Sequence, residues 1–161
     1  MKGVFRLKPV FPKYNITWDP NPVLEHFNSI GPLHTLPLDK LTYKLIVLLA
    51  LTTSQRVQTL TKIKLSNINY LDDRLEIIIT DLIKTSSPSK CQPIIILPYF
   101  TNIPGLCIAT VSKHYITVTE NVRANHDFLL LTIKKPHRPA TCQTVSKWIK
   151  KVLTIAGVNT N

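Results

Sequence analysis

The chain has 161 residues, enough for one domain or for one domain with a tail. Hydrophobic residues make up 44% of it, which is enough to bury a core and too many for a disordered chain. Lysine and arginine number 20 against 9 aspartate and glutamate, so the net charge is +11 at pH 7. A charge of this size on so small a chain favours a polyanionic partner, most simply nucleic acid.

Several classes of protein are disfavoured by simple patterns. The longest purely apolar run, Leu45 to Leu51, is far shorter than the roughly 20 residues of a membrane-spanning helix. Residues 1–11 are basic but hold no apolar stretch of the kind found in a signal peptide. We therefore expect a nuclear or cytoplasmic protein that is not secreted and does not enter a membrane. The three cysteines are widely spaced and form no C-x-x-C motif, so we expect neither a disulfide framework nor a zinc site.

The first half of the chain predicts helices. Residues 1–18 carry basic side chains among prolines and aromatics without a period, which predicts a basic extended lead-in or linker. Asp19 and Pro20 then predict the start of a short helix that ends at Gly31. Apolar residues at helical spacing predict a long, mostly buried helix over 39–53, followed by a second helix over 55–63.

The second half predicts strands and then helices. Runs of β-branched and apolar residues predict three short antiparallel strands at 75–80, 82–84 and 93–97, with a serine-rich turn before the third. A weaker helix over 106–118, a basic loop over 134–139 and a final helix ending at Gly157 follow. The expected fold is mainly α with a small three-stranded antiparallel sheet, an α+β domain formed by residues 19–161.

Arg56 is the first candidate functional residue. It follows the long buried helix, and its sequence neighbours are hydroxyl and amide side chains, with no acidic residue among the ten that follow. A planar, permanently charged guanidinium suits two phosphate oxygens. The alternative is a surface arginine paired with a distant acid.

Lysines supply the other candidates. Lys84, at the end of a predicted strand, could donate a proton to a leaving oxygen, or it could be a solubilising lysine on a sheet edge. A basic loop and one face of the final helix together could follow a phosphate backbone, although the helix face could equally be an ordinary solvated surface. These candidate DNA-binding residues are Lys134, Lys135, Arg138, Lys147, Lys150 and Lys151.

Several segments, in this order and spacing, resemble the catalytic domain of tyrosine recombinases, the phage-integrase family. The resemblance is strongest to the branch found in DIRS-type and related animal transposable elements. Residues 41–60 are similar to the helix pair that carries the family's first catalytic arginine, and residues 82–86 to the strand that carries its catalytic lysine. Residues 136–139 and 145–158 are similar to the loop and helix before the second catalytic box. Residues 19–161 would then be the N-terminal portion of an integrase-like catalytic domain.

The resemblance implies DNA strand exchange, in which a tyrosine attacks a phosphodiester and arginines stabilise the phosphoryl oxygens. It makes Arg56 the ligand of the scissile phosphate and Lys84 the general acid. It also implies duplex DNA and other recombinase protomers as partners, with no metal and no cofactor. The chain departs from the family because residues 1–161 contain no His-x-x-Arg box and no tyrosine after one, and because Thr59 replaces an acidic residue. Tyr115 is the first candidate for an unexpected nucleophile.

Three functions remain open from the sequence. The chain is a catalytically incomplete recombinase domain for DNA integration, or a domesticated or decayed fragment that binds DNA or partner recombinases without cutting. The third is a small basic RNA- or protein-binding domain without recombinase ancestry, which a structure lacking a three-stranded sheet beside the Arg56 helix would favour. For the first, the side-chain tips of Arg56 and Lys84 should share one face and lie within about 14 Å, two phosphates' span at about 7 Å per phosphate.

Overall fold

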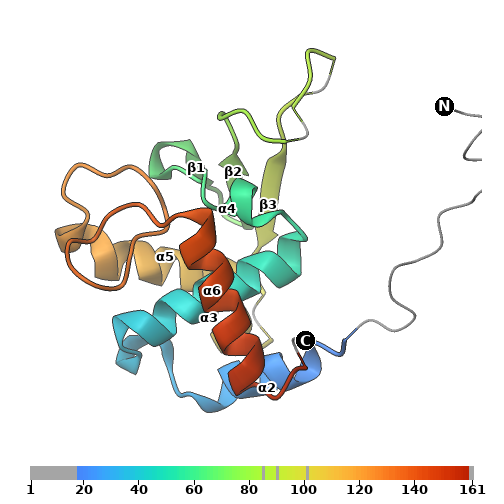
Figure 1. Cartoon of the computed structure of the whole chain (residues 1–161), viewed down its shortest axis with the longest axis vertical. Helices are drawn as coiled ribbons and strands as arrows, with labels where there is room; N and C mark the ends of the chain where they lie inside the picture. Colours follow the sequence, from blue (N-terminus) through green and yellow to red (C-terminus); the bar gives the residue numbers. More distant parts are fainter. Residues whose placement is uncertain (1–17, 85, 90, 101, 160–161) are drawn as a thin grey trace, which may run out of the picture.

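The computed structural model of the chain describes residues 18–84, 86–89, 91–100 and 102–159 (Figure 1). It has the expected α+β class, mainly helical with a small three-stranded antiparallel sheet. The predicted lead-in over residues 1–18 lies outside the described residues except for Trp18. The helices are α2 (Asn21–Ser29), α3 (Leu38–Thr53), α4 (Val57–Leu60), α5 (Ile108–Thr119) and α6 (Cys142–Ile155), and the strands are β1 (Ile68–Tyr70), β2 (Arg74–Ile78) and β3 (Ile94–Pro98).

Helix α3 forms the centre of the molecule, as its apolar pattern predicted. Figure 1 shows it crossing the middle of the fold, with α6 in front of it, the sheet above it and α2 below it. Its buried apolar side chains are all 2% exposed or less, and the helix contacts α5 and α6 as well as α4. Burying each such side chain stabilises the fold by about 1.5–3 kcal/mol. The buried residues of α3 are Leu41, Thr42, Lys44, Leu45, Ile46, Val47, Leu48 and Leu49.

The sheet has the order β1-β2-β3 and is antiparallel throughout. Leu75 and Ile77 of β2 pair with Leu97 and Ile95 of β3, and all four side chains are buried on the face that packs against the helices. The opposite face is exposed, as the alternation of a half-buried sheet requires. The sheet therefore closes one side of the core around α3.

The number of strands was predicted correctly, but their positions were partly wrong. Residues 82–84 do not form a strand: the N–H of Ile83 donates to the Ser86 hydroxyl, and the N–H of Ser86 donates to the carbonyl of Ile83. This local turn uses the backbone groups that a strand would need. The third strand is β1, which the sequence pattern did not predict, and it turns into β2 through the two-residue connection Asp72-Asp73 that follows Leu71.

The predicted helix over 55–63 is also shorter than expected. Ser54 adopts a left-handed conformation (φ 51°) and ends α3, and Arg56 is extended, so α4 begins only at Val57. It ends after Leu60, where the N–H groups of Lys62 and Ile63 donate to the carbonyls of Thr59 and Leu60, three residues back and not four. The last predicted turn is therefore a tight turn and not α-helix.

The remaining helices match their predictions closely. Gly31 and Gly157 follow α2 and α6 with φ values of 96° and 78°, the left-handed conformation that glycine adopts without strain. Helix α6 begins with a cap in which the Thr141 hydroxyl accepts the N–H of Thr144. Its apolar face packs on α3 and α4, with Val145 fully buried.

A buried lysine joins α2 to α3. The side chain of Lys44 is 1% exposed, and its ammonium donates to the carbonyl of Phe27 at 2.8 Å. That carbonyl belongs to the last turn of α2, where carbonyl groups have no partner within the helix and a positive charge is favoured. Desolvation on burial lowers the pKa of Lys44. The lysine thus serves as a C-terminal cap for α2.

A buried arginine holds the segment after α5. Arg123 is 5% exposed, and its guanidinium donates to the carbonyls of Phe128 (2.7 Å) and Leu129 (3.1 Å) and to the hydroxyl of Thr119. Burial lowers the pKa of Arg123. The guanidinium also lies over the ring of Tyr115. It therefore ties a non-helical segment to the end of α5.

We predict that Arg123→Ala lowers the free energy of unfolding by about 2–4 kcal/mol, because it leaves two buried carbonyl groups without a donor. Urea unfolding followed by circular dichroism measures this. Arg138→Ala removes the same side chain from an exposed position and should leave the free energy of unfolding unchanged. Equal losses in the two variants would contradict the anchoring role of Arg123.

Candidate nucleic-acid interface

Arg56 lies at the junction between α3 and α4. Its backbone is extended, and the left-handed Ser54 turns the chain sharply just before it. The Thr53 hydroxyl accepts the N–H of Gln55, which fixes this junction on the end of the buried helix. The Arg56 side chain is exposed, and no carboxylate of the described residues lies within ion-pair distance of it. Arg56 is therefore not the partner of a distant acid in the described part of the chain.

A polar hollow of about 390 Å³ surrounds Arg56. One wall comes from the α3–α4 junction and the other from the connection between β2 and β3. The Ser86 hydroxyl in this connection donates to the amide oxygen of Gln92, which orders the second wall. Among the described residues that line it, Arg56 carries the only charge, so the hollow suits an anion. The lining residues are Ser54, Gln55, Arg56, Thr59, Ser86, Cys91, Gln92 and Pro93.

Lys84 lies in the connection between β2 and β3, not at the end of a strand as predicted. Its side chain is exposed and makes no hydrogen bond or ion pair with the described residues. Lys84 does not line the Arg56 hollow, but Ser86, two residues further on, does. The same connection therefore carries Lys84 and forms a wall of the hollow. Whether the two side-chain tips approach one another stays a prediction.

The lysines of α6 lie on its exposed side, opposite the buried Val145 and Val152. Lys147 and Lys150 are exposed and have no acidic partner among the described residues. Lys150 lines a second hollow, of about 420 Å³, together with Val57, the residue after Arg56. The structure thus brings Lys150 close to α4 and so towards the Arg56 side of the molecule.

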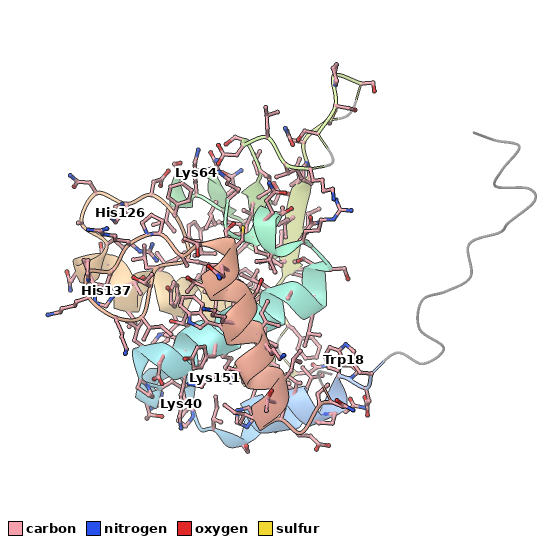
Figure 2. All side chains as sticks on the ribbon, viewed as in Figure 1. Trp18, Lys40, Lys64, His126, His137 and Lys151 are labelled. Atoms are coloured by element: carbon pink, nitrogen blue, oxygen red, sulfur yellow. The ribbon has the colours of Figure 1, made fainter. Side chains whose placement is uncertain are left out.

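Lys151 is less free than the other two lysines of α6. Its ammonium lies 4.9 Å from the centre of the Tyr43 ring and donates to the Tyr43 hydroxyl at 3.3 Å. Figure 2 labels Lys151 on the front of the molecule, near Lys40. A phosphate that binds Lys151 would compete with the Tyr43 contact. Of the three phosphate contacts expected from the lysines of α6, only that of Lys151 is weakened in this way.

The basic loop over 134–139 is held in shape by Thr132. The N–H of Thr132 donates to the carbonyl of Arg138 at 2.7 Å, and the N–H of Arg138 donates back to the Thr132 hydroxyl at 3.0 Å. The side chains of Lys134, Lys135 and Arg138 are exposed on this loop. In Figure 1 the loop lies beside α5, away from the β2–β3 connection, so the basic residues do not form a single cluster with Arg56.

A histidine from outside the basic loop, His126, joins His137, which lies within the loop. His126 and His137 line an open hollow of about 640 Å³ with Lys135 and Arg138. Figure 2 shows both histidines on the same side of the molecule. They come from two segments that only the fold brings together, so no motif could have revealed the pair. The basic loop is therefore a second, separate candidate site for phosphate groups.

The acidic residues are placed where they leave these cations free. The ion pairs among the described residues join Lys64 to Asp81, and Arg74 to both Asp73 and Glu76. Asp127 binds the backbone and hydroxyl of Ser66, which lowers the pKa of its carboxyl. None of these acids pairs with a candidate DNA-binding residue. Among the described residues, the candidate DNA-binding cations are therefore not neutralised by an ion pair.

Tyr115 is not accessible to a nucleic acid. Its side chain is 0% exposed, and its hydroxyl accepts the N–H of Leu131 at 3.2 Å. Burial raises the pKa of Tyr115, which makes the nucleophilic phenolate harder to form. The tyrosine that the sequence favoured as an unexpected nucleophile is thus a core residue.

Comparison with known proteins gives no relative for this chain: no protein-family model matches it, and no curated protein matches it. Among the described residues no helix is long and apolar enough to cross a membrane. The same residues contain no group of three or more histidine, cysteine or acidic side chains that could hold a metal ion. The site must therefore be interpreted from its own geometry and charge.

Proposed function

We propose that this chain is a DNA-binding domain of the tyrosine-recombinase type, related to integrases of transposable elements and catalytically incomplete within residues 1–161. One observation carries the proposal. Arg56, at the end of a buried helix, shares a polar hollow with the connection between two strands of a three-stranded antiparallel sheet, and that connection carries Lys84. The resemblance of residues 41–60 leads one to expect an arginine at this helix junction, whereas the resemblance of residues 82–86 places the lysine on a strand, and here it lies in the connection after β2.

The chemistry of the hollow supports a phosphate ligand. The guanidinium of Arg56 offers several N–H donors in one plane, and hydroxyl and amide groups from both walls add neutral donors. No carboxylate that would repel a phosphodiester lies among the described lining residues. In this proposal Arg56 binds a phosphate of duplex DNA, and Lys84 contacts the same phosphate or its neighbour from the β2–β3 connection.

The exposed lysines extend this contact along the duplex. Lys147 and Lys150 lie on α6, and α6 packs against α4, which begins directly after Arg56. Charges on neighbouring elements can meet successive phosphates without reading bases. Binding is therefore expected to depend little on sequence, to be micromolar or weaker, and to fall steeply with salt. Chromosomal DNA as the partner implies a nuclear location.

A non-catalytic role is favoured over strand cleavage for these residues. Cleavage needs a nucleophile, a proton donor for the leaving group and enough positive charge to stabilise the pentavalent phosphorus state. Arg56 and Lys84 could supply a phosphate ligand and the proton donor. Residues 1–161 contain no His-x-x-Arg sequence for the second arginine, and Tyr115 is buried. The alternative of a decayed or domesticated fragment that holds DNA or partner recombinases fits the same inventory.

We predict that replacing Lys147, Lys150 and Lys151 together by alanine flattens the slope of log affinity against log salt by about 2–3 units, because each lysine that meets a phosphate releases about one counterion. Fluorescence anisotropy with a labelled duplex over a salt series measures the slope. Arg74→Ala is the matched control: it removes a positive charge that is already paired with two acids, so its slope should equal that of the wild type. A triple variant with the wild-type slope would show that this helix face is only solvated.

We further predict that the chain forms no covalent complex with a nicked suicide duplex, because it lacks an accessible nucleophile at the expected place. Denaturing electrophoresis of the purified chain after incubation with the duplex is the assay. A covalent band that disappears when a single tyrosine is changed to phenylalanine would overturn this claim and identify the nucleophile. Tyr115→Phe serves as the internal control, since a buried hydroxyl should not contribute to any band.

A further inference from the structure

The outer edge of β3 has hydrogen-bonding groups that no described residue uses. Strand β3 pairs with β2 on one side, and no strand pairs with its other side (Figure 1). At the two ends of this ladder, the N–H of Ile79 donates to the carbonyl of Pro93, and the N–H of Tyr99 donates to that of Asp73. Bonded and non-bonded pairs alternate in an antiparallel ladder, so Ile95 and Leu97 also bond to β2. The N–H and C=O groups of Ile94 and Ile96 therefore point away from the sheet.

The side chains next to this edge are apolar and exposed. Ile94 is 58% exposed and Ile96 is 54% exposed, and both lie on the outer face beside Ile78 of β2. Edge strands are usually protected by a charged side chain, a bulge or a proline, since an open edge can pair with another strand. On β3 the only such feature is Pro98, at its end. An apolar edge with free hydrogen-bonding groups is a pairing surface.

The charge distribution points to the partner. Residues 91–112 contain no charged side chain, although the chain as a whole carries +11. Two copies of so basic a chain repel one another over most of their surfaces. They can approach at an uncharged edge with the least repulsion, which favours pairing of like with like at β3.

We propose that β3 pairs antiparallel with β3 of a second copy of this chain, about a two-fold axis at Ile95, to form a six-stranded sheet. In this register Ile94 faces Ile96 of the second copy, and the N–H and C=O groups of both residues are used in both copies. Gln92 faces Pro98 of the second copy. Because proline has no N–H, one hydrogen bond is absent at each end of the pair. The exposed isoleucines of the two copies then meet on one face. A symmetric contact of this kind closes on itself and stops at a dimer.

The contact is short, so the dimer should be weak and should depend on concentration. Salt should strengthen it, because screening reduces the repulsion between two positive chains. DNA binding changes in the opposite direction with salt, so the failure of one proposal can be told from the failure of the other.

Sedimentation velocity of the full chain over a concentration series, without DNA, tests the proposal. The expected result is a shift from monomer to dimer that is larger at higher salt. Ile96→Lys places a charge at the edge, and Ile96→Pro removes an outward N–H without breaking the β2 ladder; both variants should remain monomeric. Ile78→Lys is the control, because it changes the same face on the central strand, whose backbone groups are already paired, and it should dimerise as the wild type does.

Hydrogen exchange gives a second readout at single amides. The amides of Ile94 and Ile96 should become protected as the concentration rises, whereas those of Ile95 and Leu97 should be protected at all concentrations. A wild-type chain that stays monomeric throughout would overturn the proposal. A dimer that persists in both Ile96 variants, with circular dichroism confirming that they fold, would overturn it as well.

Discussion

The burial of α3 is the constraint on which the rest of the structure depends. This helix contacts α5, α6 and α4, and its largest side chains have almost no exposed surface. A helix surrounded in this way fixes the direction in which the chain leaves it. The left-handed Ser54 ends the helix, and two residues later Arg56 emerges at the surface. The position of the candidate phosphate ligand is thus set by core packing.

The same core explains why the chain tolerates two buried cations. Lys44 and Arg123 both donate to backbone carbonyls that would otherwise lack a partner, one at the end of α2 and the other after α5. Neither forms an ion pair with an acid among the described residues. These two cations stabilise the fold, and they must be separated from the exposed ones before the charge of +11 is interpreted as a sign of nucleic-acid binding.

Much of the fold could be predicted from the sequence where the pattern is local. The helical spacing of leucines defined α3, and Gly157 marked the end of α6, because both signals depend on near neighbours. The errors came where turns interrupt a periodic pattern. Bonds from Lys62 and Ile63 to carbonyls three residues back end α4 early, and a turn in which Ile83 bonds to Ser86 replaces a predicted strand. Turn bonds of this kind leave no periodic trace in the sequence.

The candidate site, like the fold, could be predicted only in part from the sequence. Arg56 could be selected from its sequence neighbours, whereas its hollow, with Ser86 and Gln92 on the opposite wall, depends on the course of the β2–β3 connection. His126 could not be associated with His137 and the rest of the basic loop, because the two segments come together only through the packing around Arg123 and Thr132. The sequence identified the charged residues, and the fold determines which of them can act together.

The central claim is that Arg56, the β2–β3 connection and the exposed lysines of α6 form one surface for duplex DNA. Titration of the isotope-labelled chain with a short duplex, followed by amide resonances in NMR spectra, tests it most directly. The account predicts that signals of Arg56, Lys84, Lys147 and Lys150 move together on a single binding curve, while those around Asp72 stay in place. Shifts confined to the β1–β2 turn and α2, with Arg56 and Lys84 unmoved, would contradict the account.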